Sequence, residues 1–457
     1  MVQELERLRT KTPFPESAPA AYPVFYRTYS RRLEGGQRES WYDVCDRTLG
    51  GLVELGQLTA DEKALVQRMQ RQLKALPSGR WLWVGGTEWS KQQKNFSGAY
   101  NCTSTNVVDW RAFGLMMDLA MMGCGTGAVL EPKYIDQLPV IRNRLTVTMT
   151  GDVGITPAAQ RREETEVTID GNHVEIRVGD SRNGWVMSYQ KILELSSQES
   201  FAGDVEIVVD LSDVRPAGET LKGFGGMANP VKLPGLYGRC AAILNAANGR
   251  KLNSVECCLL IDEAAACVVA GNIRRSAGMR QFDSSDELAA TAKDNLWQQD
   301  DDGNWRIDPE RDALRMANHT RVFHTKPSLV DMTNAVRKQF YSGEGAIQWA
   351  GEAERRAQGE GRYGLNPCGE ILGQNFHCNL AEIHLNQIDP KNLKEQEDAF
   401  RAGAIAVAAL LNHQFIEPRY QQSRLEDPIV GVSFTGLFDF FVRAFGVDWL
   451  TWWEAGR

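Results

Sequence analysis

One short segment combines three side chains that could do chemistry together. In Asn366-Pro367-Cys368-Gly369-Glu370-Ile371, a cysteine stands two residues from an amide and two residues from a carboxylate. If this segment is an extended strand or a tight loop, the period of two places Asn366, Cys368 and Glu370 on one side. A thiol, an acid or base and a hydrogen-bond donor would then face one pocket. The alternative for a single cysteine beside proline and glycine is a buried, unreactive side chain.

Other familiar catalytic motifs do not occur in the sequence. It has no CxxC pair, no HExxH and no two histidines three or four residues apart, so we expect no metal site. It also lacks a Walker A segment and a GxSxG, which argues against P-loop hydrolysis and serine-hydrolase chemistry. The nine cysteines are an odd number spread through the chain, a usage typical of reduced thiols rather than of a disulfide scaffold.

Charge and composition exclude several classes of function. The chain has 51 basic and 59 acidic residues, and the resulting formal charge of −8 disfavours a general nucleic-acid or membrane-surface binder. Hydrophobic residues make up 42% and charged residues 24%, as in folded globular proteins. No apolar stretch approaches the ~20 residues of a membrane-spanning helix, and the first residues contain no apolar leader segment. We therefore expect a cytoplasmic protein that binds neither nucleic acid nor a membrane.

Hydrophobic periodicity indicates the elements that would position the candidate residues. Residues 1–95 form an expected N-terminal helical region. An apolar helix is expected from Trp110 to Met122, and the glycines that follow it free the backbone for close approach. Residues 131–180 alternate apolar and polar around an Asp170-Gly171-Asn172 turn, which predicts an inserted β-hairpin. Strand and helix patterns then alternate, which favours α/β layering.

The Asn366–Ile371 segment resembles the active-site loop of ribonucleotide reductases, in particular the adenosylcobalamin-dependent class II enzymes. Further segments resemble the same family in the same order: YNCTSTN around Cys102, MGCGTGAVL, DSRNGW, RPAGETLKGFGG, VVAGNIRRSA, FHCNLAEIHLN around Cys378, and GVSFTGLFDFF. The N-terminal PVFYRTYSRR and PSGRWLWVGG, together with the β insertion, resemble the monomeric branch that reduces ribonucleoside triphosphates to 2′-deoxyribonucleoside triphosphates.

This resemblance implies a role for each candidate residue. Cys368 would carry a transient thiyl radical that removes the 3′ hydrogen of the ribose. Glu370 would act as the base on the 3′ hydroxyl, and Asn366 would hold the substrate hydroxyls. Cys102 and Cys378 would supply two electrons and end as a disulfide, which thioredoxin or a similar dithiol would reduce again.

The resemblance also implies the ligands. Adenosylcobalamin would start the radical, because no acid or base removes an unactivated ribose hydrogen. The backbone at Gly123, Gly125 and Gly127 would approach the substrate, with helix packing as the alternative role. A deoxynucleoside triphosphate effector would be bound and communicated by residues of two segments: Asp180, Ser181, Arg182, Arg274, Arg275 and Ser276. For the arginine pair, a solvated surface position is the alternative.

The implied fold is a ten-stranded α/β barrel made of two half-barrels, with the cysteine loop inside. Residues 96–457 would form this catalytic barrel, with 131–180 as a β-rich insertion near the effector site. The family's last barrel strands, phosphate-binding loop and C-terminal cysteine pair are not recognisable, so we expect an incomplete barrel. A C-terminal polypeptide would complete it, and the chain would otherwise be a monomer. The alternatives are a non-catalytic or split fragment of a reductase, or a reductase with another radical initiator.

Overall fold

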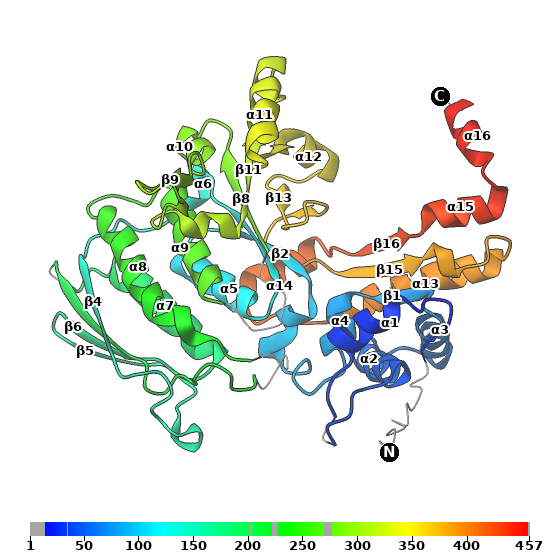
Figure 1. Ribbon diagram of the computed structural model, residues 1–457, viewed down its shortest axis with the longest axis horizontal. Coiled ribbons are helices and arrows are strands. Elements are labelled where there is room, and N and C mark those ends of the chain that lie inside the picture. The colour runs from blue at the N-terminus through cyan, green and yellow to red at the C-terminus, as the bar shows by residue number, and fades with distance from the viewer. Residues whose placement is uncertain (1–13, 34, 202, 222–226, 269–276, 456–457) are drawn as a thin grey trace. The chain divides into compact units, whose positions relative to one another are not determined.

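The computed structural model describes residues 14–33, 35–201, 203–221, 227–268 and 277–455, and the chain divides into two compact units (Figure 1). The first unit joins residues 1–101 to residues 378–457, and the second consists of residues 102–377. The expected helical region 1–95 falls inside the first unit. The expected catalytic region is shared between both units.

The first unit is mostly helical and contains one small sheet. Its strands β1 (Ala75–Pro77), β15 (Leu380–His384) and β16 (Gly431–Thr435) lie in the order β1-β15-β16, with β1 antiparallel and β16 parallel to β15. Capping boxes at Ser40 and Thr59 start two of its helices, because each side chain accepts a backbone N–H. The helices are α1 (Ala21–Val24), α2 (Trp41–Gly56), α3 (Ala60–Arg71), α4 (Gly79–Val84), α13 (Leu393–Leu410), α14 (Pro418–Glu426), α15 (Leu437–Phe445) and α16 (Trp449–Ala455).

A five-stranded parallel sheet forms the centre of the second unit. Its order is β12-β11-β8-β3-β2. The strands are β2 (Cys102–Asn106), β3 (Gly125–Val129), β8 (Gly278–Asp283), β11 (Asn318–Phe323) and β12 (Ala346–Trp349). Every residue of β2 and β3 is buried, as expected for parallel strands covered on both faces. These five strands are half of the expected ten, and in the described part of the chain no sheet closes into a barrel.

Helices connect the strands of this sheet in the expected α/β manner. Helix α5 (Trp110–Met121) links β2 to β3 and matches the helix expected from the sequence. Helix α11 (Leu329–Ser342) links β11 to β12. The other short elements are α6 (Pro132–Ile135), α10 (Glu287–Thr291), α12 (Ala350–Ala357) and an antiparallel pair of β9 (Trp297–Gln299) with β10 (Trp305–Ile307).

A separate four-stranded sheet contains the expected hairpin. Strands β5 (Glu166–Asp170) and β6 (His173–Arg177) pair antiparallel around Gly171, whose φ of +58° suits glycine in this turn. The sheet order is β4-β7-β6-β5, and it adds β4 (Leu145–Thr150) and β7 (Val205–Asp210). Because helix α7 (Arg182–Leu195) carries the chain from β6 to the parallel strand β7, this β-rich part extends past residue 180.

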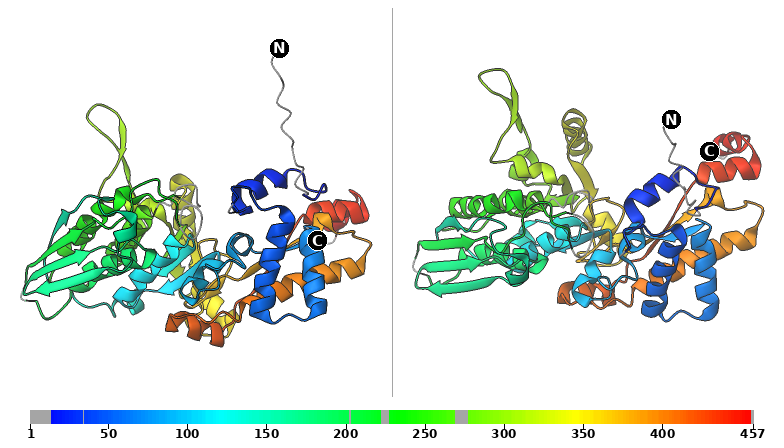
Figure 2. Two further views of the ribbon diagram at one scale, coloured as in Figure 1. Left: turned by 90° about the horizontal axis from the view of Figure 1, so that it is seen from below. Right: turned by 60° about the horizontal axis from the view of Figure 1, so that its bottom comes forward.

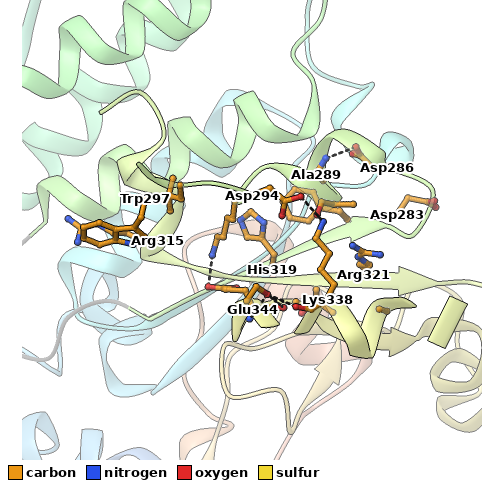
Figure 3. Close-up of a pocket in the computed structure, with 18 residues that line it drawn as sticks. Asp283, Asp286, Ala289, Asp294, Trp297, Arg315, His319, Arg321, Lys338 and Glu344 are labelled. Carbon is orange, nitrogen blue, oxygen red and sulfur yellow. Dashed lines mark hydrogen bonds and ion pairs between the residues drawn. The ribbon is translucent and has the colours of Figure 1, made fainter. Parts of the chain in front are cut away.

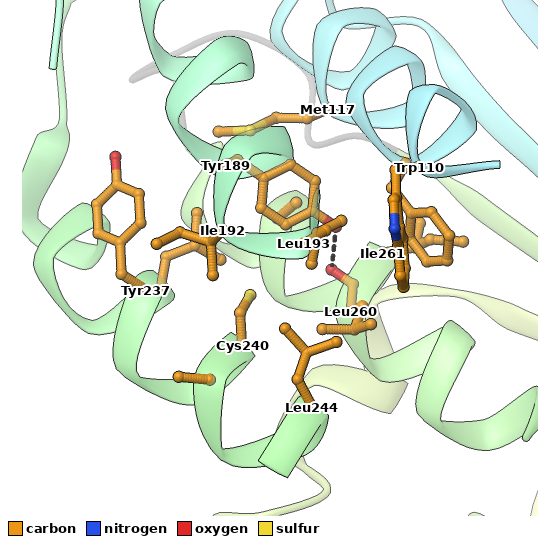
Figure 4. Close-up of a cluster of buried hydrophobic side chains, with 14 of the residues drawn as sticks. Trp110, Met117, Tyr189, Ile192, Leu193, Tyr237, Cys240, Leu244, Leu260 and Ile261 are labelled. Carbon is orange, nitrogen blue, oxygen red and sulfur yellow. Dashed lines mark hydrogen bonds between the residues drawn. The ribbon is translucent and has the colours of Figure 1, made fainter. Parts of the chain in front are cut away.

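The main core of the second unit lies between four helices and the four-stranded sheet. Figure 4 shows side chains of α5, α7, α8 (Leu233–Ala246) and α9 (Ser254–Cys267) packed together. Within this core the hydroxyl of Tyr189 donates to the carbonyl oxygen of Leu260 at 2.9 Å, so the buried phenol is satisfied. Helices α7 and α8 lie across one face of the four-stranded sheet (Figures 1 and 2).

The helices show no membrane span. In the described ranges, none combines the length and the apolar character needed to cross a bilayer.

Candidate functional site

The segment with the candidate chemistry is a tight loop at the tip of a short hairpin. Strands β13 (Gly364–Leu365) and β14 (Leu372–Gly373) pair antiparallel on either side of it. The N–H of Gly369 donates to the carbonyl oxygen of Asn366 at 2.9 Å, and Gly369 has a φ of +78°. Of the two conformations considered for this segment, the tight loop is therefore the observed one. The loop exposes Cys368 and Glu370 and buries Asn366 completely.

Two of the three candidate cysteines lie next to each other. The Sγ atoms of Cys102 and Cys368 are 3.8 Å apart, although the residues are separated by 266 positions in the sequence. Cys102 is the first residue of β2 and is 4% exposed, whereas Cys368 is exposed at the loop tip. The parallel sheet fixes the first thiol and the hairpin loop brings the second thiol to it.

The surroundings of Cys102 keep its thiol protonated. Burial, followed by the neighbouring Cys368 thiol, raises the pKa of Cys102 to about 12 from an ordinary value of 9.0. The carboxyl of Glu370 adds a smaller contribution in the same direction. At neutral pH this cysteine is therefore a hydrogen donor rather than a thiolate nucleophile.

Asn366 holds the loop together and still has a free donor. Its Oδ1 accepts the N–H of Ile371 at 3.2 Å. Its Nδ2 is buried and, within the described ranges, finds no hydrogen-bond partner. A buried donor of this kind is rare in folded proteins and is typical of a group that binds a ligand. A hydroxyl placed beside this loop would satisfy it.

Glycines upstream of the loop leave the space into which the loop packs. A Cβ on Gly125 would lie 2.9 Å from Cys102 Sγ and 3.0 Å from Pro367 Cγ. A Cβ on Gly127 would lie 2.1 Å from the carbonyl oxygen of Leu365. Gly123 has a φ of +71° just after α5. Close packing explains Gly125 and Gly127, with the cysteine loop rather than a helix as the partner, and their contact with a substrate stays a prediction.

Cys378 belongs to the first unit. It is 2% exposed and stands two residues before β15. Its participation with Cys102 in a redox pair stays a prediction.

The expected effector residues have structural partners in the second unit. The Oδ1 of Asp180 accepts both the backbone N–H and the Nε–H of Arg215, at 3.0 and 2.8 Å. Ser181 caps α7 by accepting the N–H of Gly184 at 2.9 Å. Arg182 forms an ion pair with Asp118 of α5, with Nε 2.7 Å from Oδ1. Arg274, Arg275 and Ser276 lie outside the described residues.

Sequence reasoning missed the polar side chains that support the loop from below. Gln281 of β8 and Gln348 of β12 both bond to the carbonyl oxygen of Tyr363, just before β13, and Gln281 also bonds to the N–H of Leu365 in β13. Glu131, directly after β3, accepts the hydroxyl of Tyr363. The available signal was the presence of glutamines inside buried strands, because an unpaired amide there is costly.

Two groups of side chains have donor atoms close enough for a metal ion: Cys258, Asp262 and His319, and Glu131, Asp283 and His324. In each group, one carboxylate is already bonded by a side chain from outside the group. Asp262 pairs with Arg280, with Oδ1 2.7 Å from Nη2, and Glu131 is bonded by Tyr363 and His324.

A cavity of about 250 Å³ lies elsewhere in the second unit, between α10, α11 and the ends of β8 and β11 (Figure 3). Its charges largely neutralise one another. Lys293 pairs with Glu344 at 2.8 Å, and Lys338 pairs with Asp294 at 3.2 Å. None of the candidate catalytic residues lines this cavity.

Comparison with known families matches two segments. Residues 149–236 match the insertion domain of B12-dependent ribonucleotide reductase, and residues 5–87 match the ribonucleotide reductase alpha domain. The first match contains strands β5, β6 and β7 with helix α7, and so continues past residue 180, as the four-stranded sheet does.

Curated relatives match along nearly the whole chain. The adenosylcobalamin-dependent ribonucleoside-triphosphate reductase of Levilactobacillus brevis is 27% identical over 500 residues, which span 96% of this chain and 64% of the relative. The protein of the same name from Lactobacillus leichmannii is 25% identical over 492 residues, spanning 94% and 63%. This chain thus spans less than two thirds of the length of these relatives.

A solved structure of a B12-dependent (class II) ribonucleotide reductase superposes with a TM-score of 0.76 at 20% identity, covering 93% of this chain and 64% of that one. The fold is therefore that of a class II ribonucleotide reductase, as the motifs predicted. The sequence is similar to those of adenosylcobalamin-dependent ribonucleoside-triphosphate reductases.

Proposed function

We propose that this chain is the radical-bearing part of a ribonucleoside-triphosphate reductase, which forms 2′-deoxyribonucleoside triphosphates through a thiyl radical on Cys368. The distance of 3.8 Å between Cys102 Sγ and Cys368 Sγ carries this proposal. One of these two sulfur atoms belongs to an exposed thiol on a loop, and the other belongs to a buried, protonated thiol on a strand. The relatives' names and the class II fold support it further.

Each of the side chains at the loop has its own role in the proposed reaction. The Cys368 thiyl takes the 3′ hydrogen of the ribose and later returns it. Glu370 accepts the proton of the 3′ hydroxyl, and the free Nδ2 of Asn366 donates a hydrogen bond to a substrate hydroxyl. The protonated Cys102 gives its proton to the 2′ hydroxyl, which leaves as water.

The redox balance requires a second thiol besides Cys102. Cys102 and Cys378 together lose two electrons and two protons and form one disulfide, while the C2′ carbon is reduced and one water leaves. A dithiol such as thioredoxin then reduces that disulfide. No disulfide joins any of the nine cysteines, and a reduced compartment such as the cytoplasm is proposed.

Adenosylcobalamin, when bound, supplies the radical. The exposed thiol of Cys368 suits this cofactor, because an initiating radical must reach the sulfur that it oxidises. A deoxynucleoside triphosphate effector is proposed at the insertion, near Asp180 and Arg182.

A C-terminal polypeptide is proposed to complete the barrel on the first unit. Among the described strands, β16 pairs with β15 alone, which leaves its other edge open. Large apolar side chains are exposed on β16, α15 and the residues that follow them: Phe434, Leu437, Phe438, Phe445, Val447, Leu450 and Trp452. The match to the Levilactobacillus brevis relative spans 64% of that relative, so the relative has further residues that this chain does not match. The assembly would contain one copy of each part.

Reconstitution tests the proposed function. The full chain is mixed with the corresponding C-terminal part of a relative, adenosylcobalamin, CTP or ATP, a dithiol and an effector, and deoxynucleotide formation is measured. Cys368→Ser should abolish both reduction and the radical signal, whereas Cys102→Ser should abolish reduction and keep the radical signal. Equal loss of the radical signal in both variants would contradict the assigned roles. The chain without the C-terminal part should form no product.

A further inference from the structure

Two buried glutamines hold the backbone at the base of the Cys368 loop. Gln281 of β8 accepts the N–H of Leu365 at 2.7 Å and donates to the carbonyl oxygen of Tyr363 at 3.2 Å. Gln348 of β12 donates to the same carbonyl oxygen at 2.6 Å. The Nε2 of Gln281 also lies 2.6 Å from the Oε1 of Gln348, so the two amides bond each other across the intervening strand β11.

The side chain of Tyr363 is held from its other end. Its hydroxyl donates to Oε2 of Glu131, and the other carboxylate oxygen of Glu131 lies 2.6 Å from Nε2 of His324. Tyr363 is fully buried and Glu131 is 1% exposed. The residue just before β13 is therefore fixed at both its backbone and its ring.

The entry side of the hairpin depends on these two amides, whereas its exit side is bonded to β2. There the N–H of Ser104 donates to the carbonyl oxygen of Phe376 at 3.1 Å, and the N–H of Asn106 donates to Oδ1 of Asn375 at 2.8 Å. Strands β13 and β14 share only two residue pairs, Gly364 with Gly373 and Leu365 with Leu372. Gly127 allows strand β13 to approach β3. It cannot by itself fix the position of β13, because close packing is not directional. Hydrogen bonds do have direction, and the two amides provide three of them to the backbone of Tyr363 and Leu365.

We propose that Gln281 and Gln348 are positioning residues that set the distance between the thiols of Cys368 and Cys102. This inference rests on the proposed function in one respect: the proposed function is the reason why the distance between the two thiols would matter for catalysis. Neither glutamine touches substrate or cofactor in this assignment. Both act through the backbone of the loop, three to five residues before the reactive sulfur.

Disulfide formation between the two thiols measures their relative position without cofactor or substrate. The experiment uses the full chain with Cys378→Ser and Cys124→Ser, because the Cys124 thiol also lies close enough to Cys102 to raise its pKa. With both changes, neither thiol competes with Cys368 for Cys102. Dipyridyl disulfide is the oxidant. It takes two electrons from the two thiols and leaves as two molecules of thiopyridone, while one Cys102–Cys368 bond forms. Peptide mass spectrometry follows the rate.

The variants separate positioning from stability. Gln281→Met removes the two hydrogen bonds that Gln281 makes to the loop base, and Gln348→Met removes the one that Gln348 makes. Gln70→Met is the matched control, because Gln70 of α3 is also fully buried and donates to Thr48 Oγ1 at 2.7 Å, but in the first unit. Thermal unfolding of each variant reports its stability.

We expect Gln281→Met and Gln348→Met to slow the disulfide by at least about tenfold, because displacements near 1 Å can cost about 100-fold in reacting pairs. Gln70→Met should leave the rate unchanged at a similar loss of thermal stability. An unchanged rate in both loop variants would reduce the glutamines to a structural role and overturn the inference, as would a parent chain that forms no such disulfide. Slowed disulfide formation in a chain that reconstitutes no reductase would instead count against the proposed function alone.

Discussion

Gly127 and Leu365 stand so close that a Cβ on the glycine would lie 2.1 Å from the carbonyl oxygen of Leu365. The strand β3 and the first strand of the cysteine hairpin are therefore in backbone contact. Only glycine permits this approach, and the approach places Pro367 and Cys368 over the start of β2.

Gly127→Ala should displace the hairpin. The added methyl group cannot fit against Leu365 O, so we expect slower Cys102–Cys368 disulfide formation and at least about a tenfold loss of reductase activity after reconstitution. Both are measured as described above. The control is Gly50→Ala in α2, where a Cβ meets nothing within 4 Å. An alanine variant with parent rates would show that the hairpin tolerates a shift.

Alkylation of Cys102 should depend steeply on pH. Its pKa is raised to about 12, so the reactive thiolate is scarce at pH 8, and we expect at least about 100-fold slower reaction with iodoacetamide than for an ordinary thiol. Peptide mass spectrometry after timed labelling gives the rate. Because the folded state favours the neutral thiol, its contribution to stability is complete below pH 9 and is lost as the pH rises towards 12. Rapid labelling of Cys102 in the folded chain at pH 8 would disprove its protonated, buried state.

The buried ion pair between Arg280 of strand β8 and Asp262 of helix α9 should be sensitive to loss of one partner. Arg280 and Asp262 are both 0% exposed, with Nη2 2.7 Å from Oδ1, and burial raises the pKa of Asp262. Arg280→Met leaves the carboxyl buried without its partner, so we expect a loss of about 3–5 kcal/mol in the free energy of unfolding. Urea unfolding measures it.

Two further variants test this explanation. Adding Asp262→Asn to Arg280→Met should recover part of the loss, because the remaining amide is uncharged. Arg355→Ala, which breaks an ion pair on the surface of α12, should leave unfolding unchanged. A single variant Arg280→Met as stable as the parent would mean that Asp262 is neutral in the fold.

The apolar side chains beside β16 should control association. Phe438 and Phe445 of α15 are 57% and 52% exposed. Replacing both with serine should reduce self-association of the isolated chain and weaken binding of the C-terminal part, as measured by analytical ultracentrifugation. Trp305→Ser, at a 66% exposed position in the other unit, serves as the control. Equal effects from both changes would show general surface stickiness instead of a docking face.

Much of the site could be predicted because the relevant signals are local. The helix at Trp110, the Gly171 turn and the loop from Asn366 to Ile371 each follow from adjacent residues. The family resemblance predicted that Cys102, Cys368 and Cys378 share one pocket, and the structure places Cys102 beside Cys368. The supporting amides could not be predicted in this way, since Gln281 and Leu365 are 84 residues apart and only the fold brings them together.

The extent of the β-rich insertion was underestimated for a similar reason. Strand β7 shows the burial pattern of a core strand, and its pattern does not reveal which sheet it joins. Helix α7 returns the chain to the insertion sheet, where β7 lies between β4 and β6. Sheet membership depends on this crossover rather than on the residues of the strand.

The contacts that hold the hairpin also constrain the order in which the molecule can fold. Its contacts come from β3, β8 and β12, and its two thiols are separated by 266 positions, so these contacts close very long loops and form slowly. In a nascent or half-folded chain the strands that contact the hairpin have not yet assembled. The sulfur atoms of Cys102 and Cys368 therefore remain apart. The two thiols thus come together only after nearly all of the five-stranded sheet has assembled.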